Sequence, residues 1–470
     1  MDTQNLLYES NSEDVSENSN TCKIQIKTKP TTQTKTFRYF VGFLILFSYT
    51  GVIFSFDALT ALSKHLANFP PGIDNIKLMN LFSCYSYPNI VLPFFIGYII
   101  DRFIGIQNGT ILFASIVFVG YTIEVCSVLF SAYWTMCVGR VIFGIGAESM
   151  QITQYKYIIK WFKPHGELNV IFGFLLSFVR IGTSLSLFTL PSIYNYFERY
   201  HFENTTTLAM TFCLPLASCG LSVIITIILK FIDIQYNSEY TSIEKELVNE
   251  PNQYEKIHEK IKITDFKNFS TSYYSITLIY FFYTSSITLF IITGNMILQH
   301  KFNYNSVDAG LMIGSVYIVS GLFSPLFGYV IKFMEYGINC MQFGLILLIV
   351  SNNLWCFTFS NPIITISLVS IGMAFIGCTL IPMISQTVDN TRVGMALGII
   401  QSLQNMGLSV FNNMFGYISE NYGYFLIEYI LIYFVSLALI CSFFLYLADF
   451  KNGQILNTPS CKKLKFNFGE

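Results

Sequence analysis

Twelve apolar segments, each long enough to cross a lipid bilayer, constrain this chain more than any other feature. A spanning helix needs about 20 mostly apolar residues. Only 12% of the 470 residues are charged, and the mean hydropathy is +0.52. A soluble domain carries about 25% charged residues, so we predict an all-α integral membrane protein. The predicted spans are residues 37–62, 78–100, 109–131, 134–155, 168–190, 208–231, 273–297, 307–331, 339–358, 362–385, 394–418 and 424–448.

The spans fall into two groups of six, separated by the longest polar stretch between spans. The first 36 residues are rich in Asn, Ser and Thr and contain no apolar run, which predicts a disordered tail and not a signal peptide. The predicted organisation is a cytosolic tail at 1–36, a six-helix half at 37–231, a cytosolic loop at 232–272, a second six-helix half at 273–448 and a cytosolic tail at 449–470.

Positive charge is distributed unevenly between the two ends of the predicted spans. Of the 27 Lys and Arg residues, 21 lie in the two tails and in the connections on the same side as the tails. Four lie on the opposite side, and two, Arg140 and Arg180, lie within spans. Because short cytosolic loops retain positive charge during insertion, both termini are predicted to be cytosolic. The four opposite residues are Lys64, Lys77, Arg199 and Lys301.

The two halves carry similar sequence patterns. Residues 173–182 and 398–407 both place Gly, Ser, a polar residue and Gly at the same spacing, with Arg180 at the polar position of the first half and Asn405 at that of the second. The two segments belong to spans 5 and 11, which run in the same direction. A parallel repeat of six spans is typical of transporters whose substrate site lies between the halves near the middle of the membrane.

Several classes of function are excluded by what the sequence lacks. No phosphate-binding loop, nucleophile elbow or metal-ligand spacing occurs, so we predict neither an enzyme nor a bound cofactor or metal. The formal net charge of -1 gives no basic surface for nucleic acid. The lipid bilayer and a small substrate are therefore the expected partners.

Ionisable residues inside predicted spans are the best candidates for a site, because each costs a few kcal/mol unless it is paired or hydrated. Asp57, Glu124, Glu148 and Arg180 lie in spans 1, 3, 4 and 5. At ~1.5 Å per residue, Glu148 and Arg180 come to a similar depth near the midplane. Two interpretations remain open: a structural salt bridge between spans 4 and 5, or a clamp on a zwitterionic substrate. Glu124 is either a proton site or the partner of a neighbouring charge.

Polar neighbours favour the clamp. Gln151 and Tyr155 follow Glu148 on one helical face. In the second half, Gln401, Gln404 and Asn405 offer uncharged amides for hydrogen bonds to a peptide.

We add Asp57 to these as a candidate substrate-binding residue. Asp101, Arg102 and Arg140 are candidates for conformational gating, although Arg140 also suits a purely structural role.

Several motifs resemble those of a known transporter family. Gly97-x-x-x-Asp101-Arg102-x-x-Gly105 is similar to the loop 2–3 signature of the major facilitator superfamily. Longer segments resemble the domain-containing protein 1 branch of that superfamily, and Ala147 and Tyr155 depart from its usual Gly and Asn. These segments are residues 86–89, 139–149, 161–162, 167–173, 180–182, 263–269 and 401–407.

This resemblance implies a fold, a substrate and a compartment. The branch consists of lysosomal dipeptide transporters in which an acid and an arginine engage the peptide termini, and these map onto Glu148 and Arg180. The resemblance also implies a glycosylated single-span accessory subunit, and an acidic dileucine sorting signal that Asp2, Leu6 and Leu7 match.

We therefore expect alternating-access transport of dipeptides from an acidic lumen to the cytosol, as a uniporter. Two alternatives remain: an organic-anion or proton-coupled carrier, and a membrane sensor or scaffold without flux.

Overall fold

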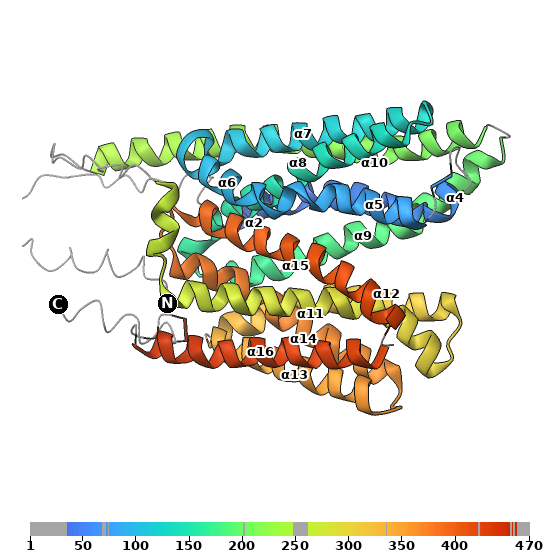
Figure 1. Cartoon of the computed structure of the whole chain (residues 1–470). Coiled ribbons are helices and arrows are strands. Elements are labelled where there is room, and N and C mark those ends of the chain that lie inside the picture. The colour runs from blue at the N-terminus through green and yellow to red at the C-terminus, as the bar shows by residue number, and fades with distance from the viewer. Residues whose placement is uncertain are drawn as a thin grey trace, which may run out of the picture.

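The chain folds into a bundle of long helices that lie side by side (Figure 1). The computed structural model describes residues 35–67, 72–73, 75–200, 203–247, 262–334, 336–421, 424–451, 454 and 456–457. The first six-span segment contains α2 (Lys35–Phe56), α3 (Ala58–Ala61), α4 (Ser63–Ala67), α5 (Asn75–Ser86), η2 (Pro88–Ile90), α6 (Leu92–Ile99), η3 (Ile100–Ile104), α7 (Gly105–Leu129), α8 (Tyr133–Phe162), η4 (Lys163–His165), α9 (Leu168–Glu198) and α10 (Asn204–Leu247). The second contains η5 (Ile263–Asn268), α11 (Thr271–Phe302), α12 (Ser306–Met334), α13 (Gly337–Phe357), α14 (Pro362–Thr387), α15 (Val393–Asn421) and α16 (Tyr424–Lys451).

The predicted all-α membrane fold is confirmed. Within the described ranges there is no strand, and nine helical segments are long and apolar enough to cross a bilayer. Helices α8 and α15, of 30 and 29 residues, are not among the nine although they run through the bundle. These two helices carry most of the polar residues predicted for the site, which is why their hydropathy is lower.

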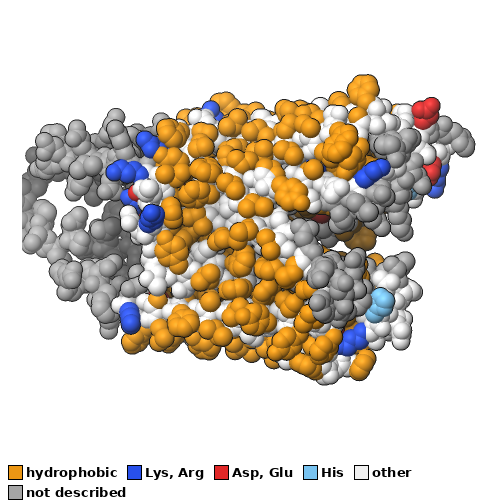
Figure 2. All heavy atoms as spheres, in the orientation of Figure 1, with side chains coloured by type: hydrophobic (Ala, Val, Ile, Leu, Met, Phe, Trp, Pro, Cys, Tyr) orange, Lys and Arg blue, Asp and Glu red, His pale blue; other side chains and the backbone are white. Residues whose placement is uncertain are grey.

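Hydrophobic side chains cover most of the face of the bundle that Figure 2 shows. Phe188, Phe231 and Phe443 are examples, with exposed fractions of 63%, 68% and 56%. In water such a surface would promote aggregation, whereas lipid tails solvate it. Lys35 of α2 and Lys451 of α16 lie at one end of the bundle, which we call the terminal end (left in Figure 1).

Two predicted spans differ in extent from the helices that contain them. Helix α10 does not end at residue 231 but continues to Leu247, so the first part of the predicted loop 232–272 is helical. Predicted span 2 is interrupted at Pro88, because proline lacks the N–H that a continuous helix needs. It ends in a π-helical turn at Ile100–Ile104, followed by Gly105 with a φ of 73°. Asp2, Leu6 and Leu7 lie outside the described residues.

The two six-span segments meet along two seams, α9 against α12 and α6 against α15. A Cβ atom on Gly173 of α9 would lie 2.5 Å from the backbone oxygen of Ser324 on α12. In the other seam a Cβ atom on Gly398 of α15 would lie even closer to the backbone oxygen of Pro93 on α6. Gly173 and Gly398 hold the same place in the sequence repeat, so the repeat corresponds to two related contacts between helices.

Candidate functional site

A cavity of about 350 Å³ lies between the two segments, near the middle of the bundle. This volume falls within the range of about 300–1,000 Å³ found for small-molecule sites. Side chains from α8, α9, α11, α12, α14 and α15 line it. The polar lining residues that the argument uses are Tyr155, Arg180, Tyr280, Tyr283, Tyr317 and Gln404.

Arg180 supplies the positive charge of this cavity. Its side chain is buried, with 5% of the residue exposed, and Nη1 donates a hydrogen bond of 2.9 Å to Oγ of Ser324. Ser324 is the sole hydrogen-bonding partner of Arg180 among the described residues, and no described carboxylate forms an ion pair with it. A buried cation costs several kcal/mol unless it is paired. The guanidinium is therefore suited to bind an anionic group that enters the cavity.

Glu148 is also buried, but its carboxylate is fully engaged. Oε1 accepts a hydrogen bond of 2.8 Å from the Tyr85 hydroxyl. Oε2 accepts from the side-chain amides of Gln401 and of Asn405, the latter at 3.2 Å. Tyr85 lies on α5 and the two amides lie on α15, so Glu148 ties the first segment to the second at mid-depth.

The structure separates Glu148 from Arg180. Among the described residues no ion pair joins them, although the sequence places them at a similar depth. Helix α9 packs mainly against α12 and shares few contacts with α8, so the two charges face different neighbours. The salt bridge considered from the sequence is not formed here.

The remaining predicted binding residues are distributed around the cavity. Tyr155 and Gln404 line it directly. Gln151 is half-buried and is not among the lining residues. Asp57 lies within hydrogen-bonding reach of Thr183 and near Tyr317, which lines the cavity.

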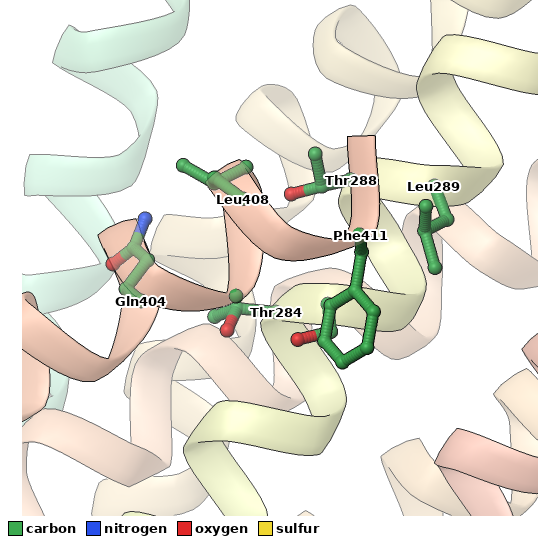
Figure 3. A pocket seen from close by; sticks show the side chains of 8 residues that line it. Thr284, Thr288, Leu289, Gln404, Leu408 and Phe411 are labelled. Carbon is green, nitrogen blue, oxygen red and sulfur yellow. The ribbon is translucent and has the colours of Figure 1, made fainter. Parts of the chain in front are cut away.

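A narrow crevice between α11 and α15 continues from the cavity at Gln404 (Figure 3). Thr284 and Thr288 from α11 line both spaces, and Leu408 and Phe411 from α15 complete the crevice. The Gln404 side-chain oxygen accepts a hydrogen bond of 2.7 Å from the Tyr280 hydroxyl. This wall therefore presents hydroxyl groups beside apolar surface.

Sequence reasoning missed Tyr85 and Ser324, whereas Gln401 and Asn405, the other partners of Glu148, were among the predicted binding residues. Tyr85 binds Glu148 and Ser324 binds Arg180, yet neither residue carries a distinctive spacing. The chain has 30 tyrosines, so no sequence signal marks Tyr85, Tyr280 or Tyr283 as site residues. The Ser-Tyr-Pro-Asn segment at 86–89, which resembles a family motif, directly follows Tyr85 and is the one sequence feature that could have drawn attention to it.

The three predicted gating residues have different environments. The Asp101 carboxylate forms an ion pair with Lys156 and accepts hydrogen bonds from the backbone N–H groups of Gly394 and Met395, at 3.1 and 2.7 Å. It therefore holds the first turn of α15 at the terminal end, where the partial positive charge of the helix favours an anion. This contact joins the two segments.

Arg102 and Arg140 make no such contact among the described residues. The exposed Arg102 lies over the rings of Tyr98 and Phe103, within its own segment. Arg140 is fully buried and lies 3.7 Å from Glu124, so Glu124 is the partner of a neighbouring charge. Its Nη2 also donates to the backbone oxygen of Phe56 at 2.9 Å. Arg102 lies at the surface in this structure, and Arg140 lies in the interior of the first segment. Their roles in gating stay predictions.

Glu167 provides a second contact between the segments at the terminal end. Its carboxylate binds Arg38 at 2.8 Å and Lys332 at 3.4 Å. Burial would raise the pKa of Glu167, but the hydrogen bond and charge of Arg38, together with the charge of Lys332, hold it below its ordinary value. The carboxylate is therefore ionised at neutral pH.

We expect Glu167→Gln to lower the free energy of unfolding by about 1.5–3 kcal/mol at pH 7, because charged hydrogen bonds contribute about that much. A depressed pKa gives stability that is present above the unfolded value of about 4.3 and is lost as the pH falls through the folded value. The difference in unfolding free energy between Glu167→Gln and the unchanged protein should thus stay the same between pH 7 and 5 and become smaller in stronger acid. Thermal unfolding in detergent measures this. Glu198→Gln, an exposed change at the far end of α9, should have no effect. A loss of stability in Glu167→Gln that disappears by pH 5 would contradict the assignment.

Contacts between the two segments lie at mid-depth and at the terminal end of the bundle. The contacts of Asp101 and Glu167 between the segments gather at the terminal end, and those of Glu148 and Arg180 lie at mid-depth. The surface is hollowed between the segments at the other end (Figure 2). The cavity with Arg180 is therefore closed toward the terminal end.

The amino-acid sequence is similar to those of known proteins over nearly its whole length. The sequence model of the Major Facilitator Superfamily matches residues 38–270 and 276–460. The chain is 32% identical over 432 residues to a Homo sapiens protein named lysosomal dipeptide transporter MFSD1, covering 92% of this chain and 90% of that protein. It is 32% identical over 430 residues to the Danio rerio protein of the same name, covering 91% and 89%.

Solved structures share the fold. The fucose transporter FucP in its outward conformation superposes with a TM-score of 0.64 at 11% identity, covering 86% of this chain and 98% of FucP. The human organic anion transporter MFSD10 superposes with a TM-score of 0.60 at 13% identity, covering 89% of this chain and 100% of MFSD10.

Proposed function

The chain belongs to the major facilitator superfamily, and on that premise we propose that it transports dipeptides by alternating access from an acidic, lysosome-like lumen to the cytosol. The observation that carries the proposal is the buried guanidinium of Arg180, which faces a cavity of about 350 Å³ between the two segments and has no described carboxylate partner. A peptide carboxylate supplies the missing anion. The relatives named as lysosomal dipeptide transporters support the same substrate class.

The terminal end is proposed to face the cytosol. Of the 27 Lys and Arg residues, 21 lie on this side and four on the other, which is the asymmetry that membrane insertion produces. In this orientation the closed terminal end would face the cytosol and the hollowed end would face the lumen. Substrate would reach Arg180 from the lumen.

The ammonium group of the peptide is assigned to Glu148. In this structure its carboxylate is held by Tyr85 and by the amides of Gln401 and Asn405. An ammonium group carries a full charge and binds a carboxylate more strongly than a neutral amide does. Substrate would therefore replace the amides of α15 at Glu148, which couples binding to movement of the second segment.

An organic-anion carrier is the alternative that a specific observation favours. Among the described residues, the cavity lining includes Arg180 but no carboxylate. Glu148 is held by Tyr85 and by the amides of α15 and is not part of this lining. A monoanion could bind to Arg180 alone. A sensor without flux has no comparable observation in its favour.

Counterflow in liposomes tests these functions. Purified full-length protein is loaded with an unlabelled dipeptide, and uptake of the labelled dipeptide is followed. Saturable dipeptide counterflow supports the proposal. Counterflow of acylated amino acids without dipeptides supports the anion carrier, and dipeptide-dependent thermal stabilisation without flux supports a sensor.

The transport mode is proposed to be uniport. The described residues of the cavity lining include no histidine, and the pH effect should be modest. Accumulation of dipeptide against its gradient, driven only by an imposed proton gradient, would contradict uniport.

Sorting to a lysosome-like membrane is attributed to Asp2, Leu6 and Leu7, which match D-x-x-x-L-L. Changing Leu6→Ala and Leu7→Ala together should move the tagged protein to the plasma membrane, because the adaptor contact is lost while the bundle is untouched. Surface biotinylation measures this, and dipeptide counterflow of the variant is the control for folding. An unchanged location would contradict the assignment.

A glycosylated single-span accessory subunit remains a proposed partner. Asn204 of Asn204-Thr205-Thr206 begins α10 and is exposed, so the chain itself also offers an acceptor for a glycan. Copurification of a glycosylated membrane protein from native membranes, followed by its identification, tests the partnership.

A further inference from the structure

A second cavity, of about 430 Å³, lies at the terminal end and is lined by three lysines. It is separate from the cavity that contains Arg180. Lysines from the end of α8 and from η4 form one wall, and residues beside the start of α15 form the opposite wall. The lining residues are Ile106, Lys156, Ile159, Lys160, Lys163, Pro164, Asn390 and Val393.

The three lysines are not equally neutralised. Lys156 is paired with Asp101, and Lys160 is paired with Asp233 at 2.6 Å. Lys163 instead donates to the side-chain oxygen of Asn390 at 2.7 Å and to the backbone oxygen of Ser385. Both of these acceptors are neutral.

The ammonium of Lys163 therefore has spare binding capacity. An ammonium has three N–H donors, and the described residues accept from two of them. No described carboxylate lies within ion-pair distance. Burial lowers the pKa of Lys163, and the nearby charge of Asp389, whose side chain is 75% exposed, only partly opposes this. A cation without a counter-ion, on the wall of a cavity, favours an anionic ligand.

We propose that this cavity binds a phosphate monoester group, with Lys163 as its principal contact and Lys160 as a second cation. A phosphate monoester carries about −1.5 to −2 charge at pH 7 and three strong acceptor oxygens. It outcompetes the neutral oxygens now bound to Lys163. Ile106, Ile159 and Val393 add apolar surface beside the lysines. The group comes either from the headgroup of a phosphoinositide in the cytosolic leaflet or from a soluble phosphate compound.

Such a ligand would act on transport without touching the dipeptide site. Lys160 and Lys163 belong to the first segment, whereas Asn390 and Val393 belong to the second. Opening the terminal end must separate these walls. A ligand that binds only while they are together stabilises the closed terminal end, so it should slow release of substrate on this side. The inference requires the cytosolic orientation but not the dipeptide assignment.

Thermal unfolding of the purified full-length protein tests the site. The probes are dioctanoyl phosphatidylinositol 4,5-bisphosphate, dioctanoyl phosphatidylinositol without the monoesters, and soluble inositol 1,4,5-trisphosphate. We expect the bisphosphate lipid to raise the unfolding temperature saturably and the unphosphorylated lipid to have no effect. Tighter binding of the lipid than of the trisphosphate identifies a membrane source, and equal binding identifies a soluble one. No effect of any phosphorylated probe overturns the proposal.

Variants of two cytosolic lysines separate the site from general charge attraction. Lys163→Gln should weaken binding of the bisphosphate lipid by about ten- to a hundredfold, as expected for losing a charged hydrogen bond, and Lys163→Arg should retain most of it. Lys267→Gln, an exposed lysine of η5, is the matched control and should bind normally. Unchanged binding in Lys163→Gln, or an equal loss in Lys267→Gln, overturns the site. An unfolding temperature close to that of the unchanged protein, measured before any probe is added, shows that each variant is folded.

Discussion

Arg180→Gln is expected to weaken binding of free dipeptides by about ten- to a hundredfold, because a charged hydrogen bond in a water-poor cavity contributes about 1.5–3 kcal/mol. Arg180 has a neutral partner, Ser324, and faces the cavity. Its loss therefore removes the group that would meet the peptide carboxylate. Dipeptides with an amidated C-terminus lack this charge, so the variant should bind them as the unchanged protein does. A titration of thermal unfolding with each ligand measures both affinities.

Two further variants sharpen this test. Arg180→Lys keeps the charge but loses the planar fork that binds both carboxylate oxygens, so it should give an intermediate loss. Arg199→Gln, an exposed change at the end of the same helix, should bind all ligands normally. If Arg180→Gln weakens free and amidated dipeptides equally, Arg180 does not hold the carboxylate.

Glu148→Gln is expected to have the complementary effect, with a loss of about ten- to a hundredfold for free dipeptides and normal binding of N-acetylated ones. A neutral amide attracts the peptide ammonium much less than a carboxylate does. The variant also weakens the contacts to Gln401 and Asn405, which hold α15 at mid-depth. We therefore expect a lower unfolding temperature without ligand as well, and the ligand pattern separates the two effects.

The double change Glu148→Gln with Arg180→Gln tests the salt bridge directly. A buried pair would leave one unpaired charge in each single variant, at about 3–5 kcal/mol, and the double variant would regain stability. The two side chains bind different partners here, so the effects on stability should add. Glu124→Gln is the contrasting variant, because it leaves Arg140 without its carboxylate partner. It should lower the unfolding temperature to the same extent whichever ligand is present. Regained stability in the double variant, with equal losses for capped and free peptides, would refute the clamp.

Length and hydropathy were enough to predict an all-α membrane protein. A bilayer requires about 20 apolar residues per span, and this requirement is visible in the sequence without any contact. Ionisable residues inside spans are rare for the same energetic reason, so Glu148, Arg180 and Asp57 could be selected without a structure. The motifs around Glu148 and Arg180 also predicted the family. The functions assigned to these residues remain predictions.

Sequence periodicity also fixed the depth of each polar residue, but not its partner. A helical repeat gives the face and height of a side chain along its own axis. Which neighbour that face meets depends on how helices pack, and helices adjacent in sequence need not be adjacent in space. Helix α9 packs against α12, which turned Arg180 to Ser324 and away from Glu148.

The tertiary structure alone decided which charges join the two segments. Asp101 and Arg102 are neighbours in the chain, yet Asp101 holds the start of α15 whereas Arg102 remains on the surface. The site and its closure depend on contacts between residues more than 100 positions apart, such as Arg180 with Ser324 and Glu148 with Asn405. Spacing along one helix carries no information about such pairs. The sequence by itself determined which polar groups enter the membrane, and packing between the segments determined which of them meet.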